Sequence, residues 1–275
     1  MEEYLGYKEI IPTDEQTEFV FRTTEGNVFD CLTNQYIIAK DEEDNILELL
    51  KYDGEKTARV PFKSVNSRFL GKVKPKNPQQ HLALDLLYDP ETTVKVITGK
   101  FGTGKDFLMC SVAIDLLEKN KFDKIVYVRN NIEVKNSKPI GFLPGSYDEK
   151  LLPFAMPLAD HLGGTDGLSL MVSHGQIEIV HLGFIRGRDI KNSIIFCSEA
   201  ENMTREHIQL LLGRVGEGSA LWLNGDFKQC DGEVFRNNNG LLAAVDKLKG
   251  HPRFGYVKLQ KTERSETAAM ADLLD

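Results

Sequence analysis

Cysteine is scarce in this chain of 275 residues, and long apolar runs are missing. The four cysteines, Cys31, Cys110, Cys197 and Cys230, lie far apart without a CxxC pair, so the sequence indicates neither a zinc site nor a disulfide framework. The first residues contain no basic stretch followed by an apolar run. No segment approaches the roughly 18 apolar residues of a membrane-spanning helix. We therefore expect a cytoplasmic protein with no membrane partner.

An excess of positive charge is also missing. The formal net charge is −7, which argues against a protein that coats nucleic acid through bulk electrostatics, because such binding uses many Lys and Arg contacts with phosphates. One basic stretch precedes the main domain and is either a solvated linker or a local nucleic-acid contact. Its residues are Lys63, Arg68, Lys72, Lys74 and Lys76.

Two regions of the chain differ in pattern. Short apolar or alternating stretches at residues 17–21, 36–39 and 46–50 are separated by turn-forming residues and predict hairpin strands. The segment 71–78 has two prolines and few apolar residues, so it is the predicted linker. We place a boundary near residue 74, with a small β-rich N-terminal region and linker at 1–74 and a main domain at 75–275.

In the main domain, predicted strands alternate with predicted helices. Such alternation indicates an α/β fold with a mostly parallel sheet and helices on both faces. The predicted strands are 94–98, 124–128, 193–197, 220–223 and 256–259, and the predicted helices are 105–118, 205–212, 241–248 and 266–274.

A glycine-rich turn lies between the first of these strands and the first helix. Its glycines allow backbone N–H groups to surround phosphate oxygens, the helix N-terminus adds its positive end, and Lys105 can reach the β- and γ-phosphates. The alternative is a strand–helix turn without a ligand. The predicted nucleotide-binding residues of the turn are Gly99, Lys100, Phe101, Gly102, Thr103, Gly104 and Lys105.

The position after Lys105 is unusual for such a loop. Ser or Thr normally provides a hydroxyl for Mg²⁺ there, but this chain has Asp106. The later strand 193–197 resembles a Walker B strand, which usually ends in an Asp-Glu pair. Here Ser198 stands at the position of the Asp, and Glu199 follows it. Either Asp106 and Ser198 have exchanged the carboxylate and the hydroxyl of one Mg²⁺ shell, or the site has decayed. Glu199 keeps the position of a carboxylate that orients or deprotonates the attacking water.

Together these segments resemble the PhoH-like family of P-loop ATPases, related to superfamily 1 helicases, over roughly residues 75–275. The resemblance rests on ordered blocks. Besides the glycine-rich turn and the Walker B-like strand, these are Asn77–Gln80, Val128–Arg129, Gly141–Gly145, Glu149–Lys150, Pro153–Pro157, Phe184–Arg188, Leu211–Gly216, Asn224–Gln229 and Glu263–Ser265. The first seventy residues show no clear acidic metal cluster, so we expect the nuclease domain of longer relatives to be absent.

The resemblance implies roles for four further residues. Gln80 is the expected contact with adenine. Gln229, supported by Asp226, is the expected γ-phosphate sensor, and Arg264 is expected close to the transferring phosphoryl group, where it would neutralise developing charge. For the arginine role, Arg186, Arg188 and Arg214 are alternatives.

The resemblance also implies partners. Phe142 and Phe154 are expected either to stack on bases or line a pore, or to pack within an irregular loop. We expect an ATPase that uses ATP and Mg²⁺, coupled to single-stranded RNA or DNA, and assembled as a homo-oligomer such as a hexameric ring. The competing interpretation is a nucleotide-binding assembly module with weak or lost turnover.

Overall fold

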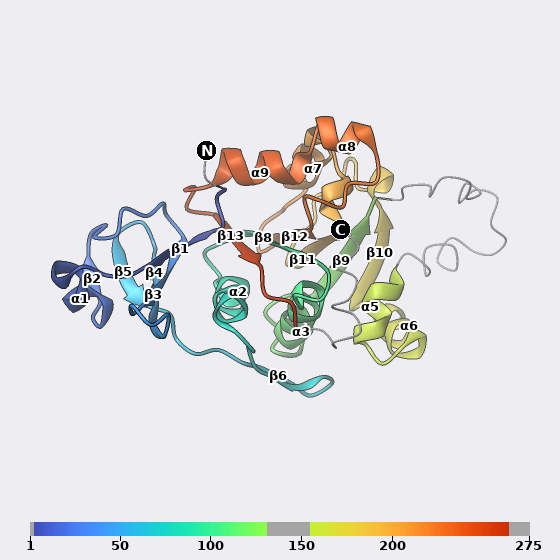
Figure 1. Ribbon diagram of the computed structural model, residues 1–275. Coiled ribbons are helices and arrows are strands. Elements are labelled where there is room, and N and C mark those ends of the chain that lie inside the picture. Colours follow the sequence, from blue (N-terminus) through green and yellow to red (C-terminus); the bar gives the residue numbers. More distant parts are fainter. Residues whose placement is uncertain (1–2, 131–154, 264–275) are drawn as a thin grey trace. The chain divides into compact units, whose positions relative to one another are not determined.

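The computed structural model describes residues 3–130 and 155–263 and confirms the predicted α/β class. Six strands form one sheet in the order β10-β9-β11-β12-β8-β13, and five N-terminal strands form another in the order β1-β3-β4-β5-β2 (Figure 1). The chain divides into two compact units. Unit 1 comprises residues up to Ser64 together with Lys74–Lys105 and the chain from Val245 onward, and unit 2 comprises Val65–Val73 and Asp106–Ala244. The predicted boundary near residue 74 stays a prediction.

The N-terminal sheet of unit 1 contains the predicted strands at 36–39 and 46–50. β1 runs parallel to β3, whereas β3, β4 and β5 form antiparallel pairs and β2 pairs with β5. Ile37, Leu50 and Val20 lie in its apolar core. The strands are β1 (Tyr7–Ile10), β2 (Thr24–Glu25), β3 (Gln35–Lys40), β4 (Ile46–Tyr52) and β5 (Lys56–Arg59).

The predicted strand at 17–21 is wrong, because this segment lies mostly within helix α1 (Asp14–Val20). The Thr13 side chain accepts a hydrogen bond from the backbone of Gln16, and the Gln16 side chain accepts one from the backbone of Thr13. This capping box satisfies two backbone donors at the helix start, and the acidic residues of the first turn complement the helix dipole. Local capping therefore outweighs the strand propensity of the Phe-Val-Phe run.

The rest of unit 1 leads to the glycine-rich turn. Helix α2 (Pro78–Tyr88) starts at Asn77, whose side chain accepts from the Gln80 backbone, and proline occupies its first turn. The helix packs on β8 (Val94–Gly99) and β13 (Phe254–Leu259). These two strands pair in parallel, which confirms both predicted strands.

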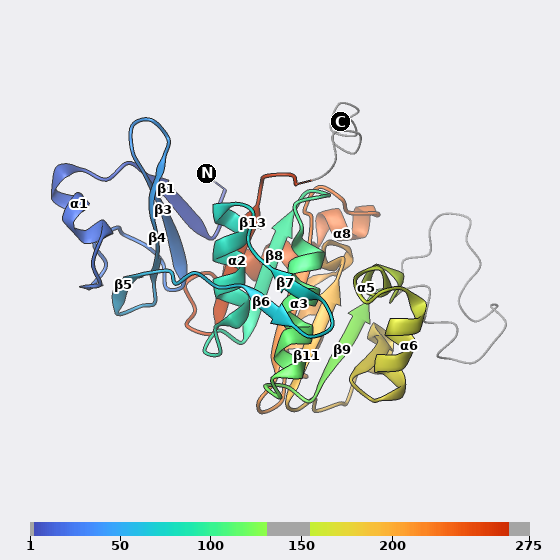
Figure 2. The same cartoon turned by 90° about the horizontal axis from the view of Figure 1, so that it is seen from below.

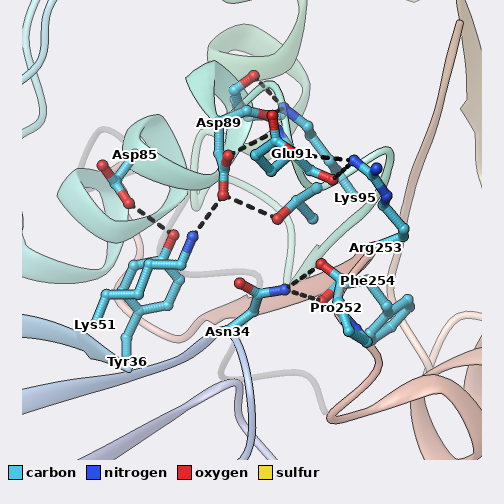
Figure 3. A network of polar contacts seen from close by, with 12 residues as sticks. Asn34, Tyr36, Lys51, Asp85, Asp89, Glu91, Lys95, Pro252, Arg253 and Phe254 are labelled. Carbon is cyan, nitrogen blue, oxygen red and sulfur yellow. Dashed lines mark hydrogen bonds and ion pairs between the residues drawn. The ribbon is translucent and has the colours of Figure 1, made fainter. Parts of the chain in front are cut away.

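Polar contacts tie α2 and the N-terminal sheet together within unit 1 (Figure 3). The Tyr36 hydroxyl donates to Asp85 at 2.9 Å, and the Lys51 ammonium lies 2.5 Å from the Asp89 carboxylate. Burial alone would raise the pKa of Asp89, but the charge and hydrogen bond of Lys51 outweigh it and lower this pKa to about 2. The Asp89 carboxylate therefore stays ionised at neutral pH at the end of α2.

Unit 2 contains four parallel strands, β9 (Lys124–Arg129), β10 (Ile177–His181), β11 (Ser193–Ser198) and β12 (Ala220–Gly225). Because they are parallel, their last residues, Arg129, His181, Ser198 and Gly225, lie at one edge of the sheet, where ligands bind in α/β folds. The predicted helices at 105–118, 205–212 and 241–248 correspond to α3 (Lys105–Glu118), α7 (Arg205–Leu212) and α9 (Gly240–Leu248). The predicted helix at 266–274 lies outside the described residues.

Shorter elements complete unit 2. The hairpin of β6 and β7 lies beside α3 (Figure 2), where the Ser67 hydroxyl donates to Glu118 at 3.0 Å. No helix within residues 3–130 and 155–263 is long and apolar enough to cross a membrane. The remaining elements are β6 (Val65–Ser67), β7 (Gly71–Val73), α5 (Met156–His161), α6 (Thr165–Ser173), η3 (Leu182–Phe184), η4 (Ala200–Asn202) and α8 (Glu233–Asn237).

Candidate functional site

The glycine-rich turn of unit 1 requires its glycines. Gly102 and Gly104 have φ of 74° and 85°, a left-handed conformation that favours glycine. A Cβ atom at Gly99 would lie 2.5 Å from the Leu259 carbonyl oxygen. The Thr103 hydroxyl donates to the Lys100 carbonyl at 2.9 Å, which closes the turn. The strand, turn and helix thus have the local geometry that a phosphate-binding loop needs.

Gln80 supports this turn. Its side chain is 4% exposed, accepts from the Lys76 backbone at 2.9 Å and donates to the Thr103 carbonyl at 3.0 Å. A Cβ atom at Gly104 would lie 3.0 Å from the Gln80 amide nitrogen. The amide therefore connects the backbone just before α2 with the turn, and the expected contact with adenine stays a prediction.

Lys105 is the first residue of α3, directly after the turn. It is 8% exposed, and its ammonium lies 5.7 Å from the centroid of the Phe101 ring. Phe101 itself is 59% exposed. The ammonium is therefore placed at the turn by a cation–π contact with an exposed ring.

Glu263 and Asn77, which the sequence analysis left without roles, also contact the turn region of unit 1. The Glu263 backbone N–H donates to the Gly102 carbonyl at 2.8 Å. The Asn77 side chain donates to the Glu263 carboxylate at 2.8 Å. The chain after β13 is thereby bound to the turn. Arg264, the predicted arginine of the site, is the next residue and lies outside the described residues.

In unit 2, Asp106 contacts a residue of the Asn-Gly-Asp motif. The Asn224 amide nitrogen donates to an Asp106 carboxylate oxygen at 2.6 Å. The amide oxygen of Asn224 accepts from the Glu199 backbone N–H at 3.2 Å. Asn224 therefore connects the start of α3 with the end of β11, and we call these two hydrogen bonds the Asn224 bridge.

Ser198 and Asp106, the predicted metal ligands, both interact with Tyr127. Burial raises the pKa of Tyr127 strongly, the hydrogen bond with Ser198 opposes this rise, and the nearby Asp106 charge adds to it. Within the described parts of the chain, no group of three or more His, Cys, Asp and Glu side chains could hold a metal ion. Mg²⁺ at nucleotide sites uses one or two protein oxygens plus phosphates and water, so one carboxylate and one hydroxyl fit its requirements.

Glu199 is held by an arginine that the sequence analysis did not assign. Arg129 Nε donates to one Glu199 carboxylate oxygen at 3.1 Å, and Arg129 Nη2 donates to the other. Burial alone would lower the pKa of Arg129, but the hydrogen bond and charge of Glu199 raise it. Glu199 also has φ of 54° and ψ of 45°, a left-handed conformation that costs a residue with a Cβ about 1–2 kcal/mol.

Asp226 and Gln229 contact each other in unit 2. One Asp226 carboxylate oxygen accepts from the Gln229 amide at 2.7 Å, and the other accepts from the Lys228 backbone at 3.0 Å. Asp226 is only 7% exposed. The Asp226 carboxylate therefore holds the Gln229 amide, and the roles of both residues at a γ-phosphate stay predictions.

The alternative arginines have differing surroundings. Arg188 makes two contacts with Glu178, at 2.7 and 3.0 Å, which are typical of a structural ion pair. Arg214 donates to the Arg188 carbonyl at 3.4 Å. Arg186 is exposed on the turn after η3. Phe142 and Phe154 lie outside the described residues.

Comparisons with known proteins agree with these motifs. The model of the family described as PhoH-like protein matches residues 72–273. The chain is 34% identical to "Protein PhoH2" of Bacillus subtilis over 99% of this chain and 65% of that protein. It is 34% identical to "Protein PhoH2" of Thermobispora bispora over 82% of this chain and 53% of that protein. A "PhoH-like protein" of Bacillus subtilis is 32% identical over 64% of this chain and 56% of its own length.

These matches cover most of this chain but only part of the first two relatives. The chain spans 65% and 53% of the length of the first two relatives, so the comparison concerns part of each. The family match covers the turn, the Asn224 bridge and the Arg129–Glu199 pair. The chain belongs to the PhoH-like protein family, a family of P-loop ATPases.

Proposed function

We propose that this chain binds ATP with Mg²⁺ and hydrolyses it to ADP and phosphate. The observation that carries the proposal is the turn from Gly99 to Gly104, which depends on its glycines and leads directly into α3 at Lys105. Backbone N–H groups and the positive end of a helix at such a turn bind phosphate oxygens. The Lys105 ammonium adds the charge that the β- and γ-phosphates require.

The hydrolytic step uses residues of unit 2. Asp106 and Ser198 would hold Mg²⁺, which when bound neutralises charge on the phosphate oxygens. Glu199 accepts the proton of the water that attacks the γ-phosphorus, and the bond to the bridging oxygen of ADP breaks. Gln229, oriented by Asp226, holds this water through its amide.

We also propose coupling to single-stranded RNA or DNA and assembly as a homo-oligomer, for which a hexameric ring is one form. In support, Phe184 is 63% exposed at the end of η3, close in sequence to the exposed Arg186. An exposed aromatic ring and a cation are the groups that bind bases and phosphates of single strands. Arg264 is the proposed arginine at the transferring phosphoryl group.

A second candidate function is a nucleotide-binding assembly module with little or no turnover. Two observations favour it. Asp106 places a carboxylate next to a loop that would bind anionic phosphates, and the Glu199 carboxylate is already paired with Arg129. In this arrangement both Glu199 carboxylate oxygens already accept hydrogen bonds from Arg129.

Release of phosphate from ATP distinguishes the two functions. The assay compares the wild type with and without Mg²⁺, and with and without single-stranded RNA or DNA of one sequence. We expect Mg²⁺-dependent release that one of the two polynucleotides accelerates. Tight ATP binding without release would favour the assembly module, and release that neither polynucleotide changes would contradict the proposed coupling.

A further inference from the structure

Asn224 occupies a site where its side chain has little freedom. It lies near the end of β12 and is 1% exposed. At the next residue, Gly225, an added Cβ atom would lie 2.3 Å from a Glu201 carboxylate oxygen and 2.8 Å from a Leu241 methyl carbon. Such packing fixes the strand end and with it the Asn224 side chain.

The two hydrogen bonds of Asn224 require a group that donates and accepts. Its amide nitrogen donates to the Asp106 carboxylate at 2.6 Å, and its amide oxygen accepts from the Glu199 backbone at 3.2 Å. An ionised Asp at position 224 could accept from Glu199 but not donate, and it would repel Asp106. An alanine would leave both partners without this contact.

The bridge connects two functionally distinct residues. Asp106 directly follows Lys105 at the start of α3, beside the phosphate-binding turn. The Glu199 carboxylate is the proposed general base. The Glu199 backbone has a left-handed conformation that needs support from its surroundings. Arg129 holds the Glu199 side chain, whereas Asn224 holds its backbone N–H. A shift of Asp106 therefore changes the support of the Glu199 backbone through one amide.

We propose that Asn224 is a positioning residue that couples Asp106, beside the phosphate-binding turn, to the orientation of Glu199. The predicted change in kcat rests on the proposed function. The effect of the bridge on the Glu199 backbone can be measured without ATP hydrolysis. When Asp106 takes part in binding the nucleotide complex, its hydrogen bond with Asn224 changes, and the support of the Glu199 backbone changes with it. Glu199 then acquires its active geometry only when the phosphate site is filled.

The first test exchanges the two side chains of the bridge. Asn224→Asp places two carboxylates in contact and is expected to reduce kcat about 100-fold with KM changed less than about threefold, since misplaced catalytic groups cost that much. In the double variant Asp106→Asn with Asn224→Asp, residue 106 donates and residue 224 accepts from both partners. Hydrogen exchange of the Glu199 backbone amide, which we expect to be faster in Asn224→Asp alone, should return toward the wild-type rate in this double variant, and this readout does not use the Asp106 carboxylate as a metal ligand.

A matched control separates positioning from stability. Asn34 is another buried asparagine, 6% exposed, that donates to the Pro252 and Phe254 carbonyls. Asn34→Asp is expected to lower thermal stability while kcat of the folded protein changes less than about twofold. If Asn224→Asp and Asn34→Asp affect kcat alike once stability is matched, or if the double variant shows no recovery, the inference is wrong.

The second test needs no turnover. Hydrogen exchange of the Glu199 backbone amide is compared between the wild type and Asn224→Ala, a change that removes the amide oxygen accepting from Glu199. We expect this amide to exchange at least about tenfold faster in the variant. ATP with Mg²⁺ should change its exchange in the wild type but not in Asn224→Ala. Equal exchange in both proteins would overturn the bridge, whereas a wild type without hydrolysis would defeat the proposed function alone.

Discussion

At the scale of single residues, the exchange of functional groups between Asp106 and Ser198 is the main departure from an ordinary nucleotide site. Both side chains interact with Tyr127, and Asp106 is also held by Asn224. That Asp106 and Ser198 share one Mg²⁺ shell, rather than being two unrelated substitutions, stays our prediction for this pair.

A double-mutant cycle tests the shared shell. Asp106→Thr leaves two hydroxyls and no carboxylate, whereas Ser198→Asp places two carboxylates beside the phosphates, so each single change should lower the ATPase rate about tenfold or more. The double variant restores the usual ligand set and should regain activity. The measurement is the ATPase rate across a Mg²⁺ titration. Additive effects of the two changes would show that the residues do not share a metal.

Other site residues could not be assigned from the sequence alone. The turn at 99–105 is recognisable because its spacing is local, and Asp226 with Gln229 is recognisable because the two lie within one short motif. Arg129 and Asn224 belong to recognised blocks, but their partners lie far along the chain. A contact between residues 70 or 118 positions apart depends on strand order, which the local pattern does not encode.

At the scale of elements, Lys95 of β8 supports the C-terminal end of α2. Lys95 is 4% exposed, and its ammonium donates to the Leu87 and Asp89 carbonyls at 2.6 Å each. Burial lowers the pKa of Lys95 from 10.5 to about 7, with the Asp89 charge opposing the shift. A neutral amine still has two hydrogens for the two carbonyls, so the contact survives deprotonation.

This lowered pKa predicts a pH-dependent stability. Between pH 7 and 10.5 the unfolded chain holds the Lys95 proton and the folded chain releases it, so the free energy of unfolding rises with pH. Between about pH 8 and about pH 9, the free energy of unfolding of the wild type should rise by about 1 kcal/mol per pH unit relative to that of Lys95→Met. Urea unfolding at these pH values measures the difference.

The control is Lys56→Met, the same change at an exposed lysine of β5. The pH dependence seen for Lys95→Met is compared with that of this variant, so that effects common to any Lys-to-Met change are removed. A constant difference for Lys95→Met would mean that the two carbonyls keep the buried ammonium charged, contrary to the prediction.

Most elements of the main domain could be predicted, for physical reasons that also explain the failures. Helices α3 and α7 have the bounds that their apolar periodicity predicts. The α1 segment was misread because its strand-like apolar residues were weighed without the capping box at Thr13. β10 was missed because, among the described strands, it lies at the end of the sheet beside β9 and is half-buried, so its five residues carry a weak apolar signal.

At the scale of the whole molecule, we predict a homo-oligomer whose nucleotide sites lie at or near subunit interfaces. Among the described residues, one six-stranded parallel sheet carries the glycine-rich turn. We propose that the group opposite the γ-phosphate comes from a neighbouring subunit or from Arg264 of the same chain. Light scattering with and without ATP measures the assembly. A strict monomer under both conditions would contradict the oligomer and leave only a self-contained site.

The central claim, that the glycine-rich turn serves ATP hydrolysis, is tested most directly by phosphate release from Mg²⁺-ATP. The wild type should release phosphate, and Lys105→Ala should reduce release at least about 100-fold and weaken ATP binding, because the turn alone leaves phosphate charge uncompensated. Glu199→Gln should bind ATP almost normally but release phosphate about 100-fold more slowly, since it removes the base and keeps the shape. Wild-type turnover in Lys105→Ala would contradict the account.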